Sequence, residues 1–402
     1  MRFISKTTLA AAAIALAAPA VQAGEVKVGS VGGVTGPIAE LVAAIVDGRN
    51  LAAKDVNDQG GLFNGDTYRL VLGDSACDPK AGVDAGNKIV NVEQVVAVIG
   101  ASCSGATNGM VQSVTIPAGV VSVSDSATAP SITDLADNDL VFRVAPSDAY
   151  QGLALAKLVK SSGITKVAMT YANDDYNAGL AAVFAREFAA MGGTVTANQA
   201  HEPDKPSYRS ELATMAKGGA EALAVFAYYG SSGITIIRNS LENGLFGKFY
   251  AADGMFDQSV IDQIGADTLR GNISITQSAS DYGDESYKLF AAAFSAGGGN
   301  PQAPYVAHGY DASFLMALAI EKAGSADRSK ISAALRAVAN APGEVIRPGE
   351  WKKAKALIAA GKDINYEGAS GNVDFDKNGD VGGIYSVNTV GADGKWENKL
   401  LR

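Results

Sequence analysis

The chain has 402 residues, more than a single hydrophobic core usually supports, so two domains are expected. Its 33 Lys and Arg against 42 Asp and Glu give a net charge of −9 without any basic patch, which argues against nucleic acid or anionic lipid as a partner. There is no C-x-x-C pair and no metal-ligand spacing around His201 or His308, so redox and zinc chemistry are disfavoured.

The first 23 residues have the pattern of a secretory signal peptide. Arg2 and Lys6 supply a positive start, an Ala-rich apolar run follows over residues 9–18, and Val21-Gln22-Ala23 gives a small-x-small cleavage pattern. A membrane anchor is the alternative, but it needs roughly 20 uninterrupted apolar residues, and this run is shorter and closes at Pro19. Because no cysteine stands at the predicted cut, we expect a mature protein that is soluble in the periplasm.

Short β-branched runs then alternate with amphipathic stretches of helical period, which predicts βαβ units and parallel sheets. The first such series predicts one Rossmann-like lobe. Its strands are expected at residues 26–31, 68–74, 95–100 and 119–124, and its helices at about 38–57, 79–93 and 106–115.

A second alternation predicts a lobe of similar build. Its strands are expected at residues 166–171, 194–200, 222–227 and 248–252, and three later helices, at about 284–295, 307–323 and 329–340, are expected to pack back on the first lobe. The predicted fold is therefore α/β, with two Rossmann-like lobes and parallel-type sheets joined by a multi-strand hinge.

The predicted boundaries follow from this alternation. Lobe one takes residues 24–143 and about 280–341, lobe two takes 144–279 and about 368–402, and about 342–367 form a crossing and insertion. Hinge strands are expected near residues 143–147 and 277–281 and within about 341–367.

Several motifs that would indicate enzymatic or metal chemistry are incomplete. The Gly-rich turn at residues 29–36 spells neither G-x-G-x-x-G nor a P-loop, so a tight strand-to-helix turn is the better interpretation. Residues 374–379 begin like an EF-hand loop, but Tyr385 stands where a bidentate Glu is required, which favours a polar hairpin turn at Asn378-Gly379. No G-x-S-x-G elbow is present, and Asp174-Asp175 reads as a solvated or helix-capping pair. No catalytic residue, metal or cofactor is predicted.

The two cysteines, Cys77 and Cys103, favour a disulfide over two free thiols, because the expected compartment is oxidising. Closing a loop of about 25 residues stabilises a fold by roughly 3 kcal/mol on the chain-entropy model.

Two hydroxyl-rich loops follow predicted strands of the first lobe. They are residues 102–107 and 124–130. Ligands of open α/β sheets bind beyond the carboxyl ends of the strands, and hydroxyl and backbone N–H groups at a helix start hold anions, so a carboxylate is the natural guest. Helix capping by the same Ser and Thr residues is the alternative interpretation.

At these residues the chain resembles the leucine/isoleucine/valine-binding proteins of ABC transporters, which are type I periplasmic binding proteins. The likeness spans the mature chain. It is carried by Gly36-Pro37-Ile38-Ala39, Asn57-Asp58-Gln59-Gly60-Gly61, Ala76-Cys77-Asp78-Pro79-Lys80, Cys103-Ser104, Ser126-Ala127-Thr128-Ala129-Pro130, Asp175-Tyr176 and Phe375-Asp376 before Asn378-Gly379-Asp380.

The resemblance implies a ligand site between the lobes. It assigns the ligand carboxylate to the hydroxyls of Ser104 and Thr128 and to backbone groups of Ser126 and Ala127. It also makes Cys77 and Cys103 look like the disulfide of the family. On the second lobe it assigns aromatic closure to Tyr176 and Tyr229, the α-ammonium to Asp253, and an aromatic wall to Tyr305.

Two residues depart from the family pattern. Leu41 replaces a tyrosine that packs against the ligand side chain, and Asp253 is one methylene shorter than the usual glutamate. The resemblance implies a periplasmic, monomeric binding protein that delivers a small, branched-chain or similarly apolar amino acid to an inner-membrane ABC permease. Alternatives are a carrier of an aliphatic amide or aromatic acid, a periplasmic hydrolase or dehydrogenase, or a structural protein of the envelope.

Overall fold

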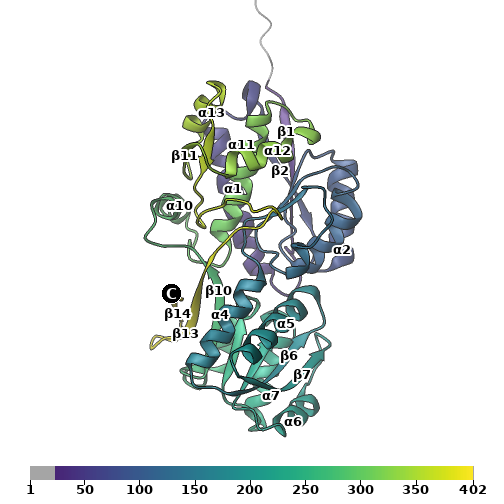
Figure 1. The fold of residues 1–402 in the computed structure, drawn as a ribbon, viewed down its shortest axis with the longest axis vertical. Coiled ribbons are helices and arrows are strands. Elements are labelled where there is room, and N and C mark those ends of the chain that lie inside the picture. Colours follow the sequence, from purple (N-terminus) through teal and green to yellow (C-terminus); the bar gives the residue numbers. More distant parts are fainter. Residues whose placement is uncertain (1–22, 402) are drawn as a thin grey trace, which may run out of the picture.

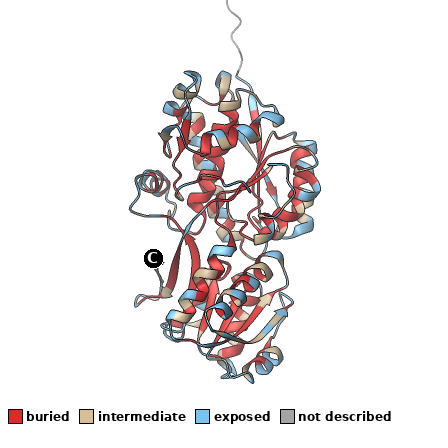
Figure 2. Cartoon of the chain, in the orientation of Figure 1, coloured by how far each residue is buried: buried red, intermediate tan, exposed pale blue. Residues whose placement is uncertain are grey.

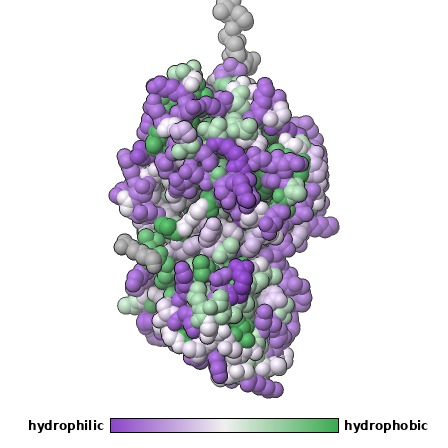
Figure 3. All heavy atoms as spheres, in the orientation of Figure 1, coloured by the Kyte–Doolittle hydropathy of each residue, from purple (hydrophilic) through white to green (hydrophobic). Residues whose placement is uncertain are grey.

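The computed structural model describes residues 23–401, which form two α/β lobes stacked end to end (Figure 1). The predicted signal peptide, except for Ala23, lies outside the described residues. Polar side chains cover most of the face seen in Figure 3, and buried residues fill the centre of each lobe in Figure 2. No helix in the described range is long and apolar enough to cross a membrane.

Lobe one is built on a five-stranded parallel sheet with the order β2-β1-β3-β4-β5. Its strands are β1 (Glu25–Gly32), β2 (Thr67–Asp74), β3 (Val98–Ile99), β4 (Ser122–Ser124) and β5 (Val141–Arg143). The first helices are α1 (Ala39–Asp58), α2 (Pro79–Asn87) and α3 (Ser104–Met110), the last two continuing as single π-turns. Helix α2 begins where the sequence dictates, because Pro79 occupies the first turn and the Asp78 carboxylate accepts from the Ala81 N–H.

Later segments return to lobe one: the three helices expected there, and a further segment that was expected to form a crossing and insertion. They are α10 (Glu285–Ala296), α11 (Val306–Ala323), α12 (Arg328–Ala339), β11 (Glu344–Ile346), α13 (Trp351–Ala359) and β12 (Ile364–Tyr366). Helix α11 is buried along almost its whole length and packs on α1.

Lobe two has a seven-stranded sheet with the order β14-β13-β10-β9-β8-β6-β7. Five strands are parallel: β6 (Lys166–Ala172), β7 (Thr194–His201), β8 (Ala222–Phe226), β9 (Phe249–Ala252) and β10 (Ile273–Ala279). Its helices are α4 (Asp148–Ser161), α5 (Asp175–Ala190), α6 (Arg209–Ala216), α7 (Ile234–Glu242), α8 (Gln258–Ile264) and α9 (Ala266–Leu269). The fully buried Ala-Leu-Ala-Val-Phe run of β8 is typical of a central strand covered on both faces.

The C-terminal edge of this sheet was not predicted. Strands β13 (Ile384–Val390) and β14 (Trp396–Leu401) add to β10 in antiparallel fashion, and the hairpin between them turns at Gly391–Lys395. The hairpin predicted at Asn378-Gly379 is wrong: those residues form a turn closed by the Asp376 N–H and the Asp380 carbonyl, with no paired strands on either side.

The chain crosses between the lobes three times, after β5, after β10 and before β13 (Figure 1). The third crossing comes later than expected, because residues 344–366 fold onto lobe one and bury Trp351, whose indole N–H donates to the Gly61 carbonyl at 3.1 Å. Phe375 still packs on lobe one, 4.9 Å from Phe142 between ring centroids. Beyond it, the buried Arg143 guanidinium pairs with Asp380 at 2.6 Å and fixes the first crossing to the third.

Candidate functional site

A cavity lies between the lobes, at the carboxyl ends of strands from both sheets. About 330 Å³ of atom-free space lies there, including space open to solvent. Its lining comprises Ile38, Leu41, Ile45, Ser102, Cys103, Ser104, Ser126 and Tyr305 from lobe one, and Tyr176, Tyr228, Asp253 and Gly254 from lobe two. The α1 residues among them give the cavity an apolar wall.

The lobe-one side offers neutral hydrogen-bond donors. The buried Ser104 Oγ accepts from the backbone N–H groups of Thr128 at 3.2 Å and Ala129 at 3.1 Å, which leaves its own hydroxyl hydrogen to donate into the cavity. The Ser126 hydroxyl donates to the Ser102 carbonyl at 2.8 Å and joins the two hydroxyl-rich loops. The Ser104 hydroxyl is thus a neutral donor, which suits a carboxylate because it holds an anion without burying a competing cation.

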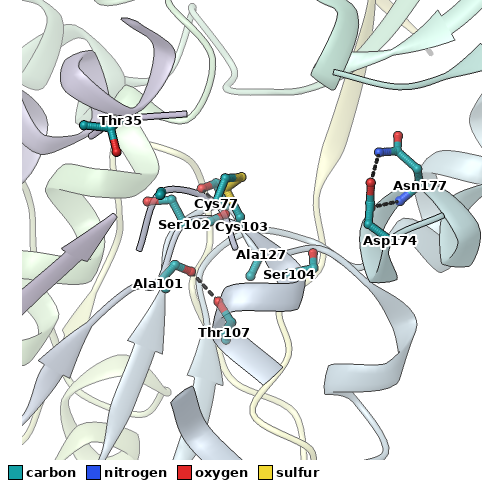
Figure 4. Close-up of a disulfide and its surroundings, with 12 residues drawn as sticks. Thr35, Cys77, Ala101, Ser102, Cys103, Ser104, Thr107, Ala127, Asp174 and Asn177 are labelled. Carbon is teal, nitrogen blue, oxygen red and sulfur yellow. Dashed lines mark hydrogen bonds between the residues drawn. A yellow bond between two sulfur atoms is a disulfide. The ribbon is translucent and has the colours of Figure 1, made fainter. Parts of the chain in front are cut away.

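The disulfide between Cys77 and Cys103 anchors this side of the cavity (Figure 4), and the predicted pairing is confirmed. It links the loop after β2 to the start of α3, across a sequence separation of 26 residues. Ser102 and Ser104 therefore flank a covalently fixed position.

A buried ion pair lies directly behind the same loops. The Arg49 Nε donates to the Asp125 carboxylate at 2.6 Å, and both side chains are fully buried. Arg49 also donates to the Val31 carbonyl at 2.9 Å and to the Ser102 hydroxyl at 2.8 Å. One guanidinium thus ties α1 and the end of β1 to both loops that line the cavity.

The lobe-two side is centred on a carboxylate that has no basic partner among residues 23–401. Asp253 follows β9, and its Oδ1 accepts from the Gln151 amide at 2.6 Å. Among the described residues no Lys, Arg or His forms a salt bridge with it. Burial raises the pKa of Asp253 above its usual value, and the Gln151 amide and the Tyr176 and Tyr305 hydroxyls oppose that rise. A buried carboxylate in this setting favours a cationic guest.

Aromatic side chains enclose the acid. The rings of Tyr176 and Tyr228 stack with centroids 5.4 Å apart, and the Tyr176 hydroxyl accepts from the Gly254 N–H at 3.2 Å. Tyr305 is buried at the start of α11. Together they exclude water from Asp253, which strengthens any charge pair formed there.

The family model described as the receptor family ligand binding region matches residues 48–392. The chain belongs to this family. A "Leucine-, isoleucine-, valine-, threonine-, and alanine-binding protein" of Pseudomonas aeruginosa is 29% identical over 335 residues, which cover 83% of this chain and 88% of that protein. The resemblance to type I periplasmic binding proteins of the leucine/isoleucine/valine-binding group is confirmed.

Solved structures show the same fold. The leucine-binding protein LivK of Thermotoga maritima superposes with a TM-score of 0.78 at 24% identity, covering 93% of this chain and 97% of that chain. A solute-binding protein of an ABC transporter from R. palustris, in complex with benzoate, gives a TM-score of 0.75 at 20% identity and covers 94% of this chain and 96% of that chain.

Six of the residues that family membership suggested for the site line the cavity together. They are Leu41, Ser104, Ser126, Tyr176, Asp253 and Tyr305. Ala127 and Thr128 are not part of the cavity lining, and their polar groups bind other protein groups. The Ala127 N–H donates to the Ser124 hydroxyl, and the Thr128 hydroxyl donates to Asp148.

Tyr228, and not the predicted Tyr229, is the tyrosine of this pair that lines the cavity. Tyr229 begins a π-turn over Tyr229–Gly233, and its ring packs in the apolar cluster beside Leu41. Adjacent tyrosines point in different directions at such a turn, and residue type alone does not decide which one faces the ligand.

Asp148 was missed by the sequence reasoning. It is fully buried at the start of α4, one oxygen accepts from the Thr128 hydroxyl at 3.0 Å, and the other has no protein partner within the described chain. Burial raises the pKa of Asp148 well above its usual range, and nearby Asp253 adds to the rise. In the sequence it follows Ser147 at a helix start, where an acid reads as an ordinary first-turn residue.

Proposed function

We propose that this protein is the periplasmic substrate-binding component of an ABC importer, which captures a small amino acid, branched-chain or similarly apolar, in the interlobe cavity. The single observation that carries the proposal is Asp253, a buried carboxylate without a salt-bridge partner in the described chain, placed in a cavity whose other side presents the Ser104 hydroxyl. A zwitterion satisfies both ends at once. Ile38, Leu41 and Ile45 then receive its side chain.

The name of a relative supports the binding of an amino acid. The Pseudomonas relative is named as a binding protein for leucine, isoleucine, valine, threonine and alanine. We further propose a monomeric, non-enzymatic carrier that works with an inner-membrane permease. The R. palustris structure holds benzoate on a similar fold, so an aromatic acid is the second candidate, and Asp253 argues against it because a plain acid leaves that carboxylate without a counter-charge.

A thermal-shift panel tests the proposal. The full mature chain is heated with each common amino acid, with acetamide and with benzoate. An amino acid present at 100 times its dissociation constant stabilises the folded state by about 2.7 kcal/mol, so leucine, isoleucine or valine should raise Tm clearly while acetamide and benzoate should not. Stabilisation by benzoate alone supports the second candidate. No stabilisation by any compound supports a structural role, and consumption of the amino acid during incubation supports an enzyme.

Capture requires the lobes to close, and the structure shows them in contact around the cavity. The Asn108 amide of lobe one donates to Asp175 of lobe two at 2.7 Å. A Cβ atom placed on Gly230 of lobe two would lie 2.2 Å from the Pro37 carbonyl of lobe one. The lobes can therefore approach this closely only because residue 230 is a glycine, which has no Cβ atom.

Gly230→Ala is expected to weaken leucine binding about tenfold, because the added methyl group keeps the lobes apart at this contact. Calorimetric titration measures the change in affinity, and small-angle scattering measures the loss of ligand-induced compaction. Gly247→Ala is the matched control, since a Cβ there meets no atom within 4 Å. Equal affinity of the two variants would contradict the assigned closure contact.

A further inference from the structure

A second hollow opens in the interlobe groove next to the cavity. Leu41 lines both spaces, so one side chain forms the partition between them. The outer hollow holds about 1070 Å³ of space open to solvent, and both lobes contribute to its walls. The groove therefore begins where the apolar wall of the ligand cavity ends, on the other side of Leu41.

Gln277 on β10 lines this groove with a polar amide and is only 2% exposed. Its Oε1 accepts from the Asn388 amide at 3.0 Å, and the Asn398 amide donates to the Asn388 Oδ1 at 2.8 Å. The Gln277 Nε2 donates to no acceptor among the described residues, although protein atoms do not seal it off from the groove. This donor faces the groove without an acceptor in the described part of the chain, so it is free to donate to a guest that brings a carbonyl oxygen.

The groove also has an apolar wall. Trp396 and Phe256 pack with ring centroids 5.5 Å apart, and the indole N–H is already used by the Asp257 carbonyl at 3.0 Å. The charged residues of the lining are of both signs, Glu40 and Asp257 against Lys395, so the groove does not select a charged group. A long neutral chain that carries a carbonyl oxygen fits this combination.

We propose that the outer groove is a side-chain subsite that extends the ligand range to α-amino acids with a long, neutral side chain bearing a carbonyl oxygen, such as an N-alkylated ω-amide. The inference rests on the proposed function: the carboxylate and ammonium dock in the cavity, and the side chain passes Leu41. Its carbonyl oxygen accepts from the Gln277 amide, while its carbon stem lies on Trp396.

Calorimetric titration of the full mature chain tests this with three probes: L-leucine, N5-ethyl-L-glutamine, and L-2-aminooctanoic acid, which has the same side-chain length without the carbonyl. In the wild-type protein N5-ethyl-L-glutamine should bind tighter than L-2-aminooctanoic acid. Gln277→Met should weaken N5-ethyl-L-glutamine about tenfold and leave the other two unchanged. Trp396→Ala should weaken both long probes and leave leucine unchanged.

The outcomes separate the two proposals. Binding of leucine without any binding of N5-ethyl-L-glutamine overturns the subsite and leaves the proposed function standing. Equal losses for all three probes in Gln277→Met mean a structural role for Gln277 and also overturn the subsite. Binding of none of the probes overturns the subsite together with the proposed function.

Discussion

Asp253→Asn is expected to weaken leucine binding by about 100-fold, measured by calorimetric titration at neutral pH. Truncating the charge of one member of a buried, hydrogen-bonded pair costs roughly 2–5 kcal/mol, because the partner charge is left desolvated without compensation. Asparagine keeps the size of the side chain and an oxygen that accepts from Gln151 at the position of the present 2.6 Å hydrogen bond. The loss of affinity would therefore result from removal of the negative charge and not from altered packing.

The same substitution should change how binding depends on pH. The ligand ammonium needs an ionised Asp253, and burial raises the pKa of that carboxyl above its usual value. The wild-type protein should therefore bind leucine with full affinity at pH values above this pKa, and its affinity should decrease as the pH falls through the pKa. The Asp253→Asn variant should bind weakly at every pH, without this decrease at acidic pH.

Asp262→Asn removes an equal charge from the exposed surface of lobe two and serves as the control. A ligand whose affinity is unaffected by Asp253→Asn has no ammonium at this position. Such a result, obtained with leucine, would refute the assignment of Asp253.

The lobes were predictable because each buried strand and each amphipathic helix carries its own period in the sequence. The path of the chain after α12 was not predictable in the same way. Trp351 and Phe375 hold residues 344–381 on lobe one through contacts with Gly61 and Phe142, which are more than 200 positions away in the sequence. Hydrophobic periodicity within a segment does not reveal contacts between segments that are distant in the sequence. For this reason the third crossing was predicted too early in the chain.

The site was partly predictable from motifs for a similar reason. Ser104 and Tyr176 stand in recognisable sequence motifs, and both line the cavity, as does Asp253. Thr128 stands in such a piece too, but its hydroxyl is used by Asp148, which only the three-dimensional structure reveals. Arg49 gave no signal at all: it is one basic residue in an amphipathic helix, and its partner Asp125 lies 76 positions away.

Arg49→Met is expected to reduce the free energy of unfolding by about 3–5 kcal/mol, measured by urea titration followed by circular dichroism. Both members of the Arg49–Asp125 pair are fully buried. Removing the guanidinium leaves the Asp125 carboxylate as an uncompensated charge in the core of lobe one, which is the costly way to break a buried pair. The Val31 carbonyl and the Ser102 hydroxyl lose a donor in the same step.

Two further variants isolate the cause. Arg49→Met combined with Asp125→Asn removes both charges and should recover a large part of the lost stability, because no uncompensated ion remains. Arg69→Met breaks the exposed pair with Glu25, whose side chains are 53% and 38% exposed, and should cost at most about 1 kcal/mol. If Arg49→Met were as mild as Arg69→Met, the ion pair would not be what holds the two cavity loops in place, and Ser102 and Ser126 would need another support.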